Sequence, residues 1–200
     1  SAPGSGDVQP NSKHVLSTPL VAQLPYDSGE SAELVFITTS VATTPDSAAP
    51  GVIRVLSGQD CRLVASIVGT TKTVSALATP AIGDLDDDGI PEIVARGESN
   101  SLIAFKWNGS AYVESWAVNG NTNTNASQPW GGPSLHDLNG DGKSEVLLAG
   151  AVWNFDGTLL YDGNGNPNPF NGLSPLAADV DGDGKIELVS ERGGEITVSE

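Results

Sequence analysis

The chain carries the stretch Pro80-Ala-Ile-Gly-Asp-Leu-Asp-Asp-Asp-Gly-Ile-Pro-Glu-Ile-Val94, and its pattern returns further along the sequence. Two copies align with it without gaps, Pro133-Ser-Leu-His-Asp-Leu-Asn-Gly-Asp-Gly-Lys-Ser-Glu-Val-Leu147 and Pro175-Leu-Ala-Ala-Asp-Val-Asp-Gly-Asp-Gly-Lys-Ile-Glu-Leu-Val189. A fourth, weaker copy begins at Thr18-Pro19 and ends at Glu33-Leu34-Val35, with a two-residue insertion and few of the acidic residues. This recurrence predicts a repeat protein in which each unit is one small supersecondary element.

Each unit continues with short runs of β-forming residues. A first run follows the glutamate, a second run ends in a tight turn, and a third run follows that turn. Asn108-Gly109 and Asp156-Gly157 at two of these turns are strong hairpin signals, because type I′ turns require positive φ. The expected strands are 34–38, 93–95, 146–148 and 188–190 after the glutamates, 52–56, 102–107 and 151–155 before the turns, and 62–68, 112–118 and 158–161 after them. Each unit is therefore predicted to be four antiparallel strands, with the acidic loop between the first two.

Repeated four-stranded units predict an all-β fold of β-propeller blades. A sandwich with decorated hairpins is the alternative, but it gives no reason for an acidic loop at one place in every unit. We expect residues 1–14 to be a linker or N-terminal extension, followed by blades at approximately 15–75, 76–128, 129–171 and 172–200. The last unit reaches Glu200 before its fourth strand, which gives about three and a half to four blades. They would be part of a larger propeller, completed by blades of the same or another chain, or a four-bladed ring closed by residues 7–16.

The acidic loop places oxygen-bearing groups at alternate positions. Counted from its first aspartate, positions 1, 3 and 5 carry Asp or Asn, position 6 is Gly, position 9 is Glu, and position 7 can offer its backbone carbonyl. Glycine permits a sharp turn in a conformation that is costly for other residues. The candidate metal ligands are Asp84, Asp86, Asp88, Ile90 and Glu92 in the first loop, Asp137, Asn139, Asp141, Lys143 and Glu145 in the second, and Asp179, Asp181, Asp183, Lys185 and Glu187 in the third.

These oxygens fit calcium, so three calcium sites are predicted, each pinning one hairpin. Ca²⁺ takes about six to eight oxygen ligands, whereas Mg²⁺ prefers to keep its waters. Without a cation, the carboxylates of one loop would repel one another. An EF-hand is excluded, because it needs flanking helices and a Glu at position 12, which here is Ala95, Leu148 or Ser190. An acidic surface turn is the metal-free alternative, and three copies with identical offsets argue against it.

The loops resemble the FG-GAP and VCBS repeats of integrin-like β-propellers. The family pattern is a Gly-Pro or similar lead, then Asp-x-Asp-x-Asp-Gly-x-x-Asp/Glu and an apolar strand, and it is most similar to Trp130-Gly-Gly-Pro-Ser-Leu-His-Asp-Leu-Asn-Gly-Asp-Gly-Lys-Ser-Glu-Val146. The resemblance covers about residues 15–200. It implies a calcium-binding propeller on a secreted or cell-surface protein, serving adhesion, carbohydrate binding or protein recognition; some rhamnogalacturonan lyases use the same scaffold. The first unit departs from the pattern, because Gln23-Leu-Pro-Tyr-Asp27 offers one Asp, and no calcium is predicted there.

The charge balance excludes several kinds of partner. Nine Lys plus Arg against 25 Asp plus Glu give a formal net charge of −16. Such an excess repels nucleic acid and anionic membrane surfaces, so no nucleic acid partner is expected. Five, three and four acidic residues lie in the three loops, which is twelve of the 25. No apolar run approaches the roughly 18 residues of a membrane span, and the single Cys61 excludes a Cys-rich zinc site.

No catalytic motif is recognised in the sequence, so the chain is not expected to be an enzyme. Two residues are weaker candidates for ligand binding. Trp130 lies in a Pro-Trp-Gly-Gly loop, and His136 precedes the second acidic loop, although an inner strand would also explain the histidine. The sequence thus predicts an extracellular or cell-surface module that recognises a protein or glycan and holds structural calcium. The alternatives are the propeller portion of a polysaccharide lyase or hydrolase, and a structural subunit of a surface assembly.

Overall fold

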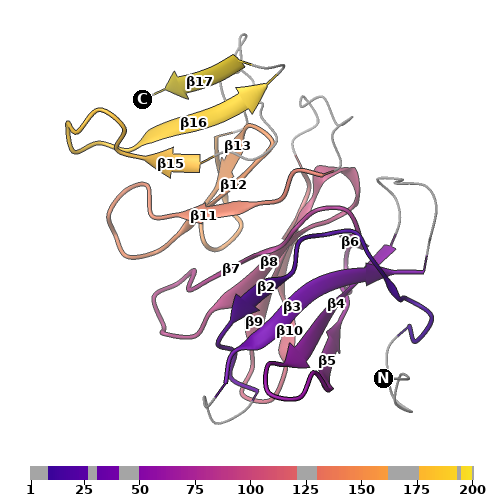
Figure 1. Ribbon diagram of the computed structural model, residues 1–200. Helices are drawn as coiled ribbons and strands as arrows, with labels where there is room; N and C mark the ends of the chain where they lie inside the picture. Colours follow the sequence, from indigo (N-terminus) through magenta and orange to yellow (C-terminus); the bar gives the residue numbers. More distant parts are fainter. Residues whose placement is uncertain are drawn as a thin grey trace.

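The computed structural model describes residues 9–26, 31–40, 50–120, 130–161, 176–192 and 195–199. These residues form β-strands and one short 3-10 helix, η1 (Glu98–Asn100). The strands make four antiparallel sheets that follow one another along the chain (Figure 1). The all-β prediction is confirmed, and the described part of the chain has no α-helix.

The first sheet contains six strands around β3. Its order is β1-β3-β4-β5, with β2 also paired to β3 and β6 to β4. The strands are β1 (His14–Val15), β2 (Leu20–Ala22), β3 (Glu33–Thr39), β4 (Pro50–Ser57), β5 (Leu63–Ile67) and β6 (Val74–Ser75). Because His14 pairs with Thr39 and Val15 with Thr38, this segment belongs to the first sheet. The alternative in which residues 7–16 complete the last sheet is therefore wrong for His14 and Val15.

The next two sheets have four strands each, in chain order. The second contains β7 (Ala81–Gly83), β8 (Glu92–Arg96), β9 (Leu102–Trp107) and β10 (Tyr112–Val118), and the third contains β11 (Ser134–His136), β12 (Glu145–Leu148), β13 (Ala151–Trp153) and β14 (Leu159–Tyr161). The fourth has β15 (Leu176–Ala178), β16 (Glu187–Arg192) and β17 (Glu195–Ser199). The predicted order of strands, with the acidic loop between the first two, is confirmed in the last three sheets.

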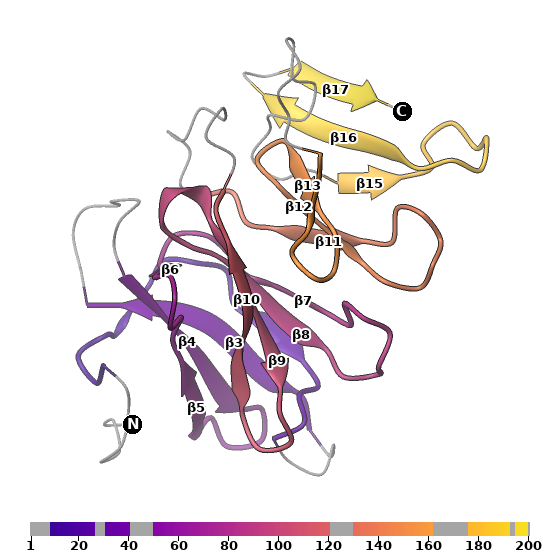
Figure 2. The same cartoon turned by 180° about the vertical axis from the view of Figure 1, so that it is seen from behind.

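The four sheets that the structure describes do not close into a ring. Figures 1 and 2 show the first and fourth sheets at opposite ends of the molecule, so the described strands do not form the four-bladed ring that the sequence left open. Instead, sheet follows sheet, and β11 lies between β7 and β15.

One strand pair in every sheet has the same register: β2 with β3 in the first sheet, and the first two strands in the other three. The residue before the loop always lies opposite the glutamate that follows it, in the pairs Ala22–Glu33, Gly83–Glu92, His136–Glu145 and Ala178–Glu187. Since side chains alternate between the two faces of a strand, one register places the four glutamates on equivalent faces.

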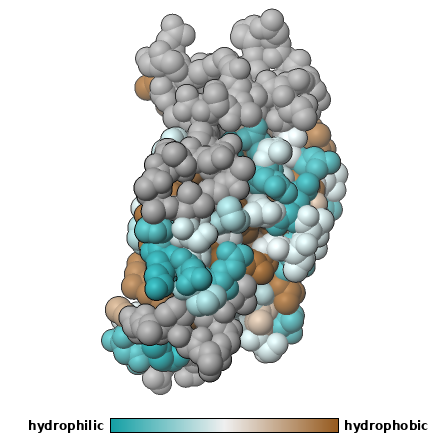
Figure 3. All heavy atoms as spheres, turned by 90° about the vertical axis from the view of Figure 1, so that its right-hand side faces the viewer, coloured by the Kyte–Doolittle hydropathy of each residue, from teal (hydrophilic) through white to brown (hydrophobic). Residues whose placement is uncertain are grey.

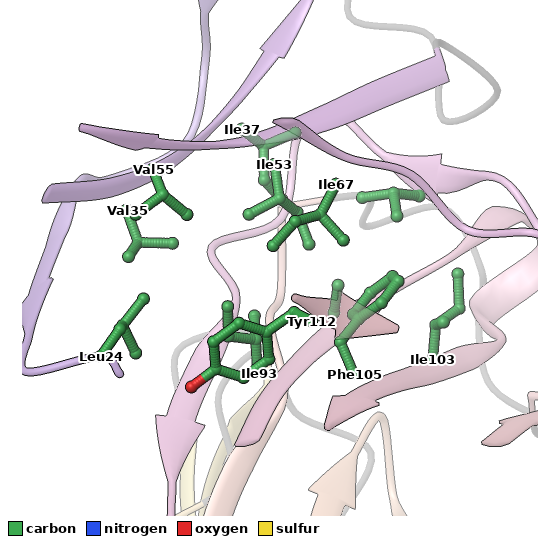
Figure 4. Packing of buried hydrophobic residues seen from close by; sticks show 12 residues of the cluster. Leu24, Val35, Ile37, Ile53, Val55, Ile67, Ile93, Ile103, Phe105 and Tyr112 are labelled. Carbon is green, nitrogen blue, oxygen red and sulfur yellow. The ribbon is translucent and has the colours of Figure 1, made fainter. Parts of the chain in front are cut away.

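Two hydrophobic clusters join the first three sheets. In one, Val35 and Ile53 of the first sheet face Ile93 and Phe105 of the second (Figure 4). In the other, Val94 packs with residues of the third sheet. The second sheet is thus covered on both faces, which explains why all five residues of β8 are buried rather than alternately exposed.

Three aromatic rings pack together at the first cluster, which contains Tyr112 and is contacted by Tyr26 and Trp107. The ring centroids of Tyr26 and Trp107 lie 4.9 Å apart, and those of Trp107 and Tyr112 lie 5.5 Å apart. The Tyr112 hydroxyl donates a hydrogen bond of 2.6 Å to the carbonyl of Pro91. Burial raises the pKa of both Tyr26 and Tyr112 above the ordinary value of a tyrosine.

These tyrosines predict a loss of stability in alkali. A pKa raised in the folded state means that the unfolded chain releases its protons first, so the free energy of unfolding should fall as pH rises above about 10. Urea unfolding at a series of pH values measures this slope. The Tyr112→Phe variant should show a shallower slope, because one of the two groups no longer titrates; equal slopes in both proteins would contradict the prediction.

Candidate metal centre

The three acidic loops lie on one side of the molecule. Residues 84–91, 137–144 and 179–186 connect the first two strands of the second, third and fourth sheets, and they project to the left in Figure 1 and to the right in Figure 2. The first two loops touch, because the backbone N–H of Ser144 donates to the carbonyl of Leu85 at 3.0 Å. Figure 3 shows the side away from the loops, where the coloured atoms form small hydrophilic and hydrophobic groups.

Each loop is closed by its buried glutamate. One carboxylate oxygen, Oε2, accepts the backbone N–H of the second loop residue, in the pairs Glu92–Leu85 (2.8 Å), Glu145–Leu138 (2.8 Å) and Glu187–Val180 (2.9 Å). The first sheet keeps this bond, since Glu33 Oε2 accepts the N–H of Leu24 at 2.8 Å. All four glutamates are at most 3% exposed. The glutamate therefore has a structural role in every sheet, with or without an acidic loop.

The aspartates shape the rest of each loop. The first aspartate accepts the N–H of the glycine at position 6 through Oδ2, over 2.7 Å to Gly89, 2.9 Å to Gly142 and 3.0 Å to Gly184. These glycines have φ of +84°, +87° and +87°, the left-handed region that the sequence prediction required. The position-5 aspartates Asp88, Asp141 and Asp183 accept the N–H of position 7 over 2.8, 2.9 and 2.8 Å. The three loops thus share one backbone conformation.

Two loops bring carboxylates together as a metal site requires. Ligand oxygens of Asp84, Asp86 and Glu92 lie within 4.8 Å of one another, and so do those of Asp179, Asp181 and Glu187. The Oε1 atoms of Glu92 and Glu187 and the Oδ1 atom of Asp86 are buried without a hydrogen-bond partner.

A cation would satisfy these buried oxygens. Burial raises the pKa of Glu92, and the charges of Asp86 and Asp88 add to this effect, while the Leu85 N–H and the charge of Lys106 oppose it. A carboxylate that is buried beside other carboxylates is costly to ionise unless positive charge compensates it. The residues present therefore fit a bound divalent cation, with Glu92 beside two partly buried aspartates in the first loop and Glu187 beside two exposed aspartates in the third.

The middle loop differs at position 3. Asn139 replaces the aspartate there, and its amide nitrogen donates to Glu145 Oε1 at 3.3 Å. Burial raises the pKa of Glu145, and Asp141 and Asp137 raise it further. Asp137, Asn139, Asp141 and Glu145 lie in one loop as predicted, but an amide nitrogen instead of an oxygen faces the buried glutamate. A metal site in this loop stays a prediction, as does ligation by the carbonyls of Ile90, Lys143 and Lys185.

Lys106 is a residue of the centre that the sequence analysis missed. It lies on β9, and its Nζ donates to Asp86 Oδ2 and, over 2.8 Å, to Asp88 Oδ2. It also lies 3.6 Å from Glu92 Oε1. These hydrogen bonds raise the pKa of Lys106, so its ammonium stays charged. The signal was the strand register: Ile93 pairs with Phe105, which places the next residue, Lys106, beside Glu92.

The two candidate ligand-binding residues lie in different surroundings. Trp130 is 49% exposed, whereas His136 is partly buried on β11 and burial lowers its pKa. The His136 Nε2 atom is buried without a hydrogen-bond partner. Nothing in the structure brings the two side chains into one site, and ligand binding by either stays a prediction. Asp27 of the first unit lies outside the described residues.

The sequence resemblance is confirmed for part of the chain. Residues 84–148, from the first acidic loop through β12, match the family model for FG-GAP-like repeats. This segment includes the first two of the three loops. No curated protein matches the chain. In the described residues, no helix has the length and apolar character that crossing a membrane requires.

The fold is similar to that of three solved lyases. Rhamnogalacturonan lyase YesW matches with a TM-score of 0.62 at 15% identity, over 94% of this chain and 39% of the lyase. The exotype rhamnogalacturonan lyase YesX matches with a TM-score of 0.59 at 16% identity, over 94% of this chain and 37% of its own. A Bacillus licheniformis rhamnogalacturonan lyase matches with a TM-score of 0.58 at 16% identity, over 90% of this chain and 36% of the lyase. This chain spans less than two fifths of these lyases, and the likeness is one of fold.

Proposed function

We propose that this chain is a calcium-binding β-propeller module of an extracellular protein, in which calcium is structural and the module recognises a protein or a glycan without catalysing a reaction. The observation that carries the calcium proposal is the buried glutamate of the first and the third acidic loop. Glu92 and Glu187 each accept a backbone N–H with Oε2 and keep Oε1 buried among aspartates without a hydrogen bond, and at Glu92 the Lys106 ammonium lies 3.6 Å from that oxygen. A bound cation gives that second oxygen a function.

Calcium suits the loops better than magnesium. Ca²⁺ accepts six to eight oxygens in flexible geometry at about 2.3–2.6 Å, whereas Mg²⁺ demands near-ideal octahedral geometry at about 2.0–2.1 Å. Carboxylates, a position-7 carbonyl and water can together supply the larger number. The exposed aspartates, such as Asp137 and Asp181, leave room for water on the open side of the loop.

Calcium titration of the EDTA-treated chain tests the proposal. Isothermal titration calorimetry should detect up to three calcium ions per chain, with the 179–187 loop among the sites occupied. Each independent site should raise the free energy of unfolding by about 2.7 kcal/mol when free calcium is about 100 times the dissociation constant. Identical urea curves with calcium and with EDTA would overturn the proposal, and magnesium serves as the control ion.

The sheets are proposed to be propeller blades, and the exposed face of the fourth sheet supports a further blade as a partner. Strand pairing aligns Leu176 with Val189 and Val189 with Val198, so these residues share one face. Leu176, Val198 and Ile196 are at least half exposed. The first three sheets bury such faces against one another, and a blade of the same or another chain would bury this one in the same way.

The recognised ligand is proposed to be a protein or a glycan. Trp130 supports a glycan, because an exposed aromatic ring offers a flat surface on which a sugar can pack. A glycan array with the wild-type chain and Trp130→Ala distinguishes the two ligand classes. Glycan binding that the variant loses would assign the tryptophan, and no glycan binding by the wild type would favour a protein ligand.

A second candidate is the propeller portion of a polysaccharide lyase. The fold similarity to rhamnogalacturonan lyases over 90–94% of this chain supports it. Incubation of the chain with rhamnogalacturonan, followed by ultraviolet absorbance of unsaturated products, tests this candidate. Product formation would replace the non-catalytic proposal, and its absence at high protein concentration would leave the recognition module as the better account.

A further inference from the structure

We propose that Lys106 is a built-in counter-ion of the 84–92 loop, which calcium must displace, so that this site binds calcium more weakly than the 179–187 site. The inference rests on the proposed calcium function and adds a difference between the loops that their sequence motifs do not contain.

The ammonium of Lys106 already contacts three of the predicted calcium ligands. It bonds Asp86 and Asp88 and lies 3.6 Å from the otherwise unpartnered Glu92 Oε1. The Asp88 contact lowers the pKa of that carboxyl, as expected when a cation stabilises the ionised form. An ammonium and a calcium ion cannot both occupy the space among these oxygens, because each needs direct contact with them. Calcium entry therefore requires the lysine to leave.

The second sheet differs from the third at this position. Pairing of Val146 with Trp153 places Asn154 beside Glu145, where the second sheet has Lys106 beside Glu92. Asn154 is uncharged, and its Oδ1 accepts the N–H of Phe155 at 2.9 Å. The strand opposite the glutamate thus brings a positive charge to one loop and a neutral amide to the next.

The lysine of the third loop is a different kind of neighbour. Lys185 belongs to the loop itself, lies 3.3 Å from Asp183 Oδ2 and has a side chain that is 65% exposed. The Lys106 side chain is 34% exposed and reaches a glutamate that is 3% exposed. Exposed pairs are screened by water and contribute little. Lys185 should therefore compete with calcium much less than Lys106.

A pocket beside the loop can accommodate the Lys106 side chain once calcium has displaced it. It has a volume of 290 Å³, and Asp86, Glu92, Lys106, Trp116, Phe155 and Asp156 are among the residues that line it. Asp156, which also lines the pocket, offers a carboxylate to the released ammonium. The exchange moves the lysine within the pocket and leaves the backbone bond between Glu92 and Leu85 intact.

Chains that retain one site each test the inference. The double variant E145Q/E187Q retains only the 84–92 site, and the double variant E92Q/E145Q retains only the 179–187 site. In each variant the glutamine side chain can still accept the backbone N–H that the glutamate accepted. In the first chain, Lys106→Gln should tighten calcium binding about tenfold or more by calorimetry. In the second, the matched change Lys185→Gln should alter the affinity by less than about threefold.

The melting temperature gives a second readout, because Lys106→Gln should change it differently without calcium and with saturating calcium. Without calcium, Lys106→Gln should melt at a lower temperature than its parent, because the carboxylates lose their counter-ion. With saturating calcium the loss should disappear or reverse. If Lys106→Gln does not fold in EDTA, calcium should restore folding, and failure to do so overturns the inference. Lys106→Arg keeps the charge and should keep the parent affinity; equal tightening by Arg and Gln also overturns it.

The outcomes separate the two proposals. If the chain that retains the 179–187 loop binds no calcium, the proposed calcium function fails and the inference fails with it. If that chain binds calcium but Lys106→Gln leaves the affinity of the 84–92 site unchanged, only the inference about Lys106 fails.

Discussion

Replacing Trp153 by alanine is expected to lower the free energy of unfolding by about 3–5 kcal/mol, the usual cost of truncating a fully buried aromatic side chain. Trp153 is 2% exposed and lies on β13, opposite Val146 of β12. It belongs to the cluster that joins the third sheet to Val94 and Ala104 of the second. The truncation therefore removes a contact between sheets, and neighbouring strands cannot collapse into the space without moving one sheet against the other. Urea unfolding with calcium held constant measures the change.

Trp130 provides the matched control for this prediction. The same substitution there removes an indole that is 49% exposed, and its effect should stay within about 0.5 kcal/mol. Equal losses in the two variants would mean that the second and third sheets are not held together by the buried cluster. If Trp153→Ala changed the slope of the free energy of unfolding against urea concentration, the sheets would unfold separately.

Glu187→Gln is expected to remove about 2.7 kcal/mol of calcium-dependent stabilisation when free calcium is about 100 times the dissociation constant of this site. The physical reason is that the two oxygens of the Glu187 carboxylate have different roles. Oε2 holds the Val180 N–H, a bond that glutamine can preserve, whereas Oε1 is the unpartnered atom aimed at the aspartates. In EDTA the variant should therefore be about as stable as the wild type, or more so, since a buried charge is gone.

Glu33→Gln is the control that separates the backbone hydrogen bond of the glutamate from its proposed calcium ligation. Glu33 makes the same bond to Leu24 and is 1% exposed, but no calcium site is predicted in its unit. Its substitution should leave the calcium dependence unchanged. Urea curves of both variants, each with calcium and with EDTA, measure the effects. The metal proposal would be contradicted if both variants lost calcium-dependent stability equally, or if neither did.

The strands and loops were largely predictable from the sequence. The runs predicted at 102–107 and 112–118 are β9 and β10 to the residue. The run predicted at 151–155 is shorter, since β13 ends at Trp153 and Asn154 already bonds Thr158 across the turn. Gly89, Gly142 and Gly184 have the positive φ that their loop position demands. These features follow from side-chain alternation and turn chemistry, which act over a few neighbouring residues.

The composition of the candidate site was less predictable. The motif names aspartates at fixed offsets but does not show that the Asn139 amide nitrogen turns toward Glu145. Nor does it reveal that a lysine from another strand enters the first loop. The Asn139 and Lys106 contacts each depend on which side chains meet in the folded structure. Strand register and side-chain orientation decide those hydrogen bonds, and the spacing of residues along the chain does not.

The sequence by itself determined that the chain is a series of antiparallel β-units with one acidic loop in each of the last three. It could do so because strands, turns and loop ligands are encoded by residues close together in the chain. Only the tertiary structure decided what each unit packs against and which charge faces each loop. The second sheet is buried on both faces, His14 and Val15 pair with the first sheet, and Lys106 occupies the loop beside Glu92. Each of these results from pairing or packing between residues distant in sequence, where small differences in register change which side chains meet.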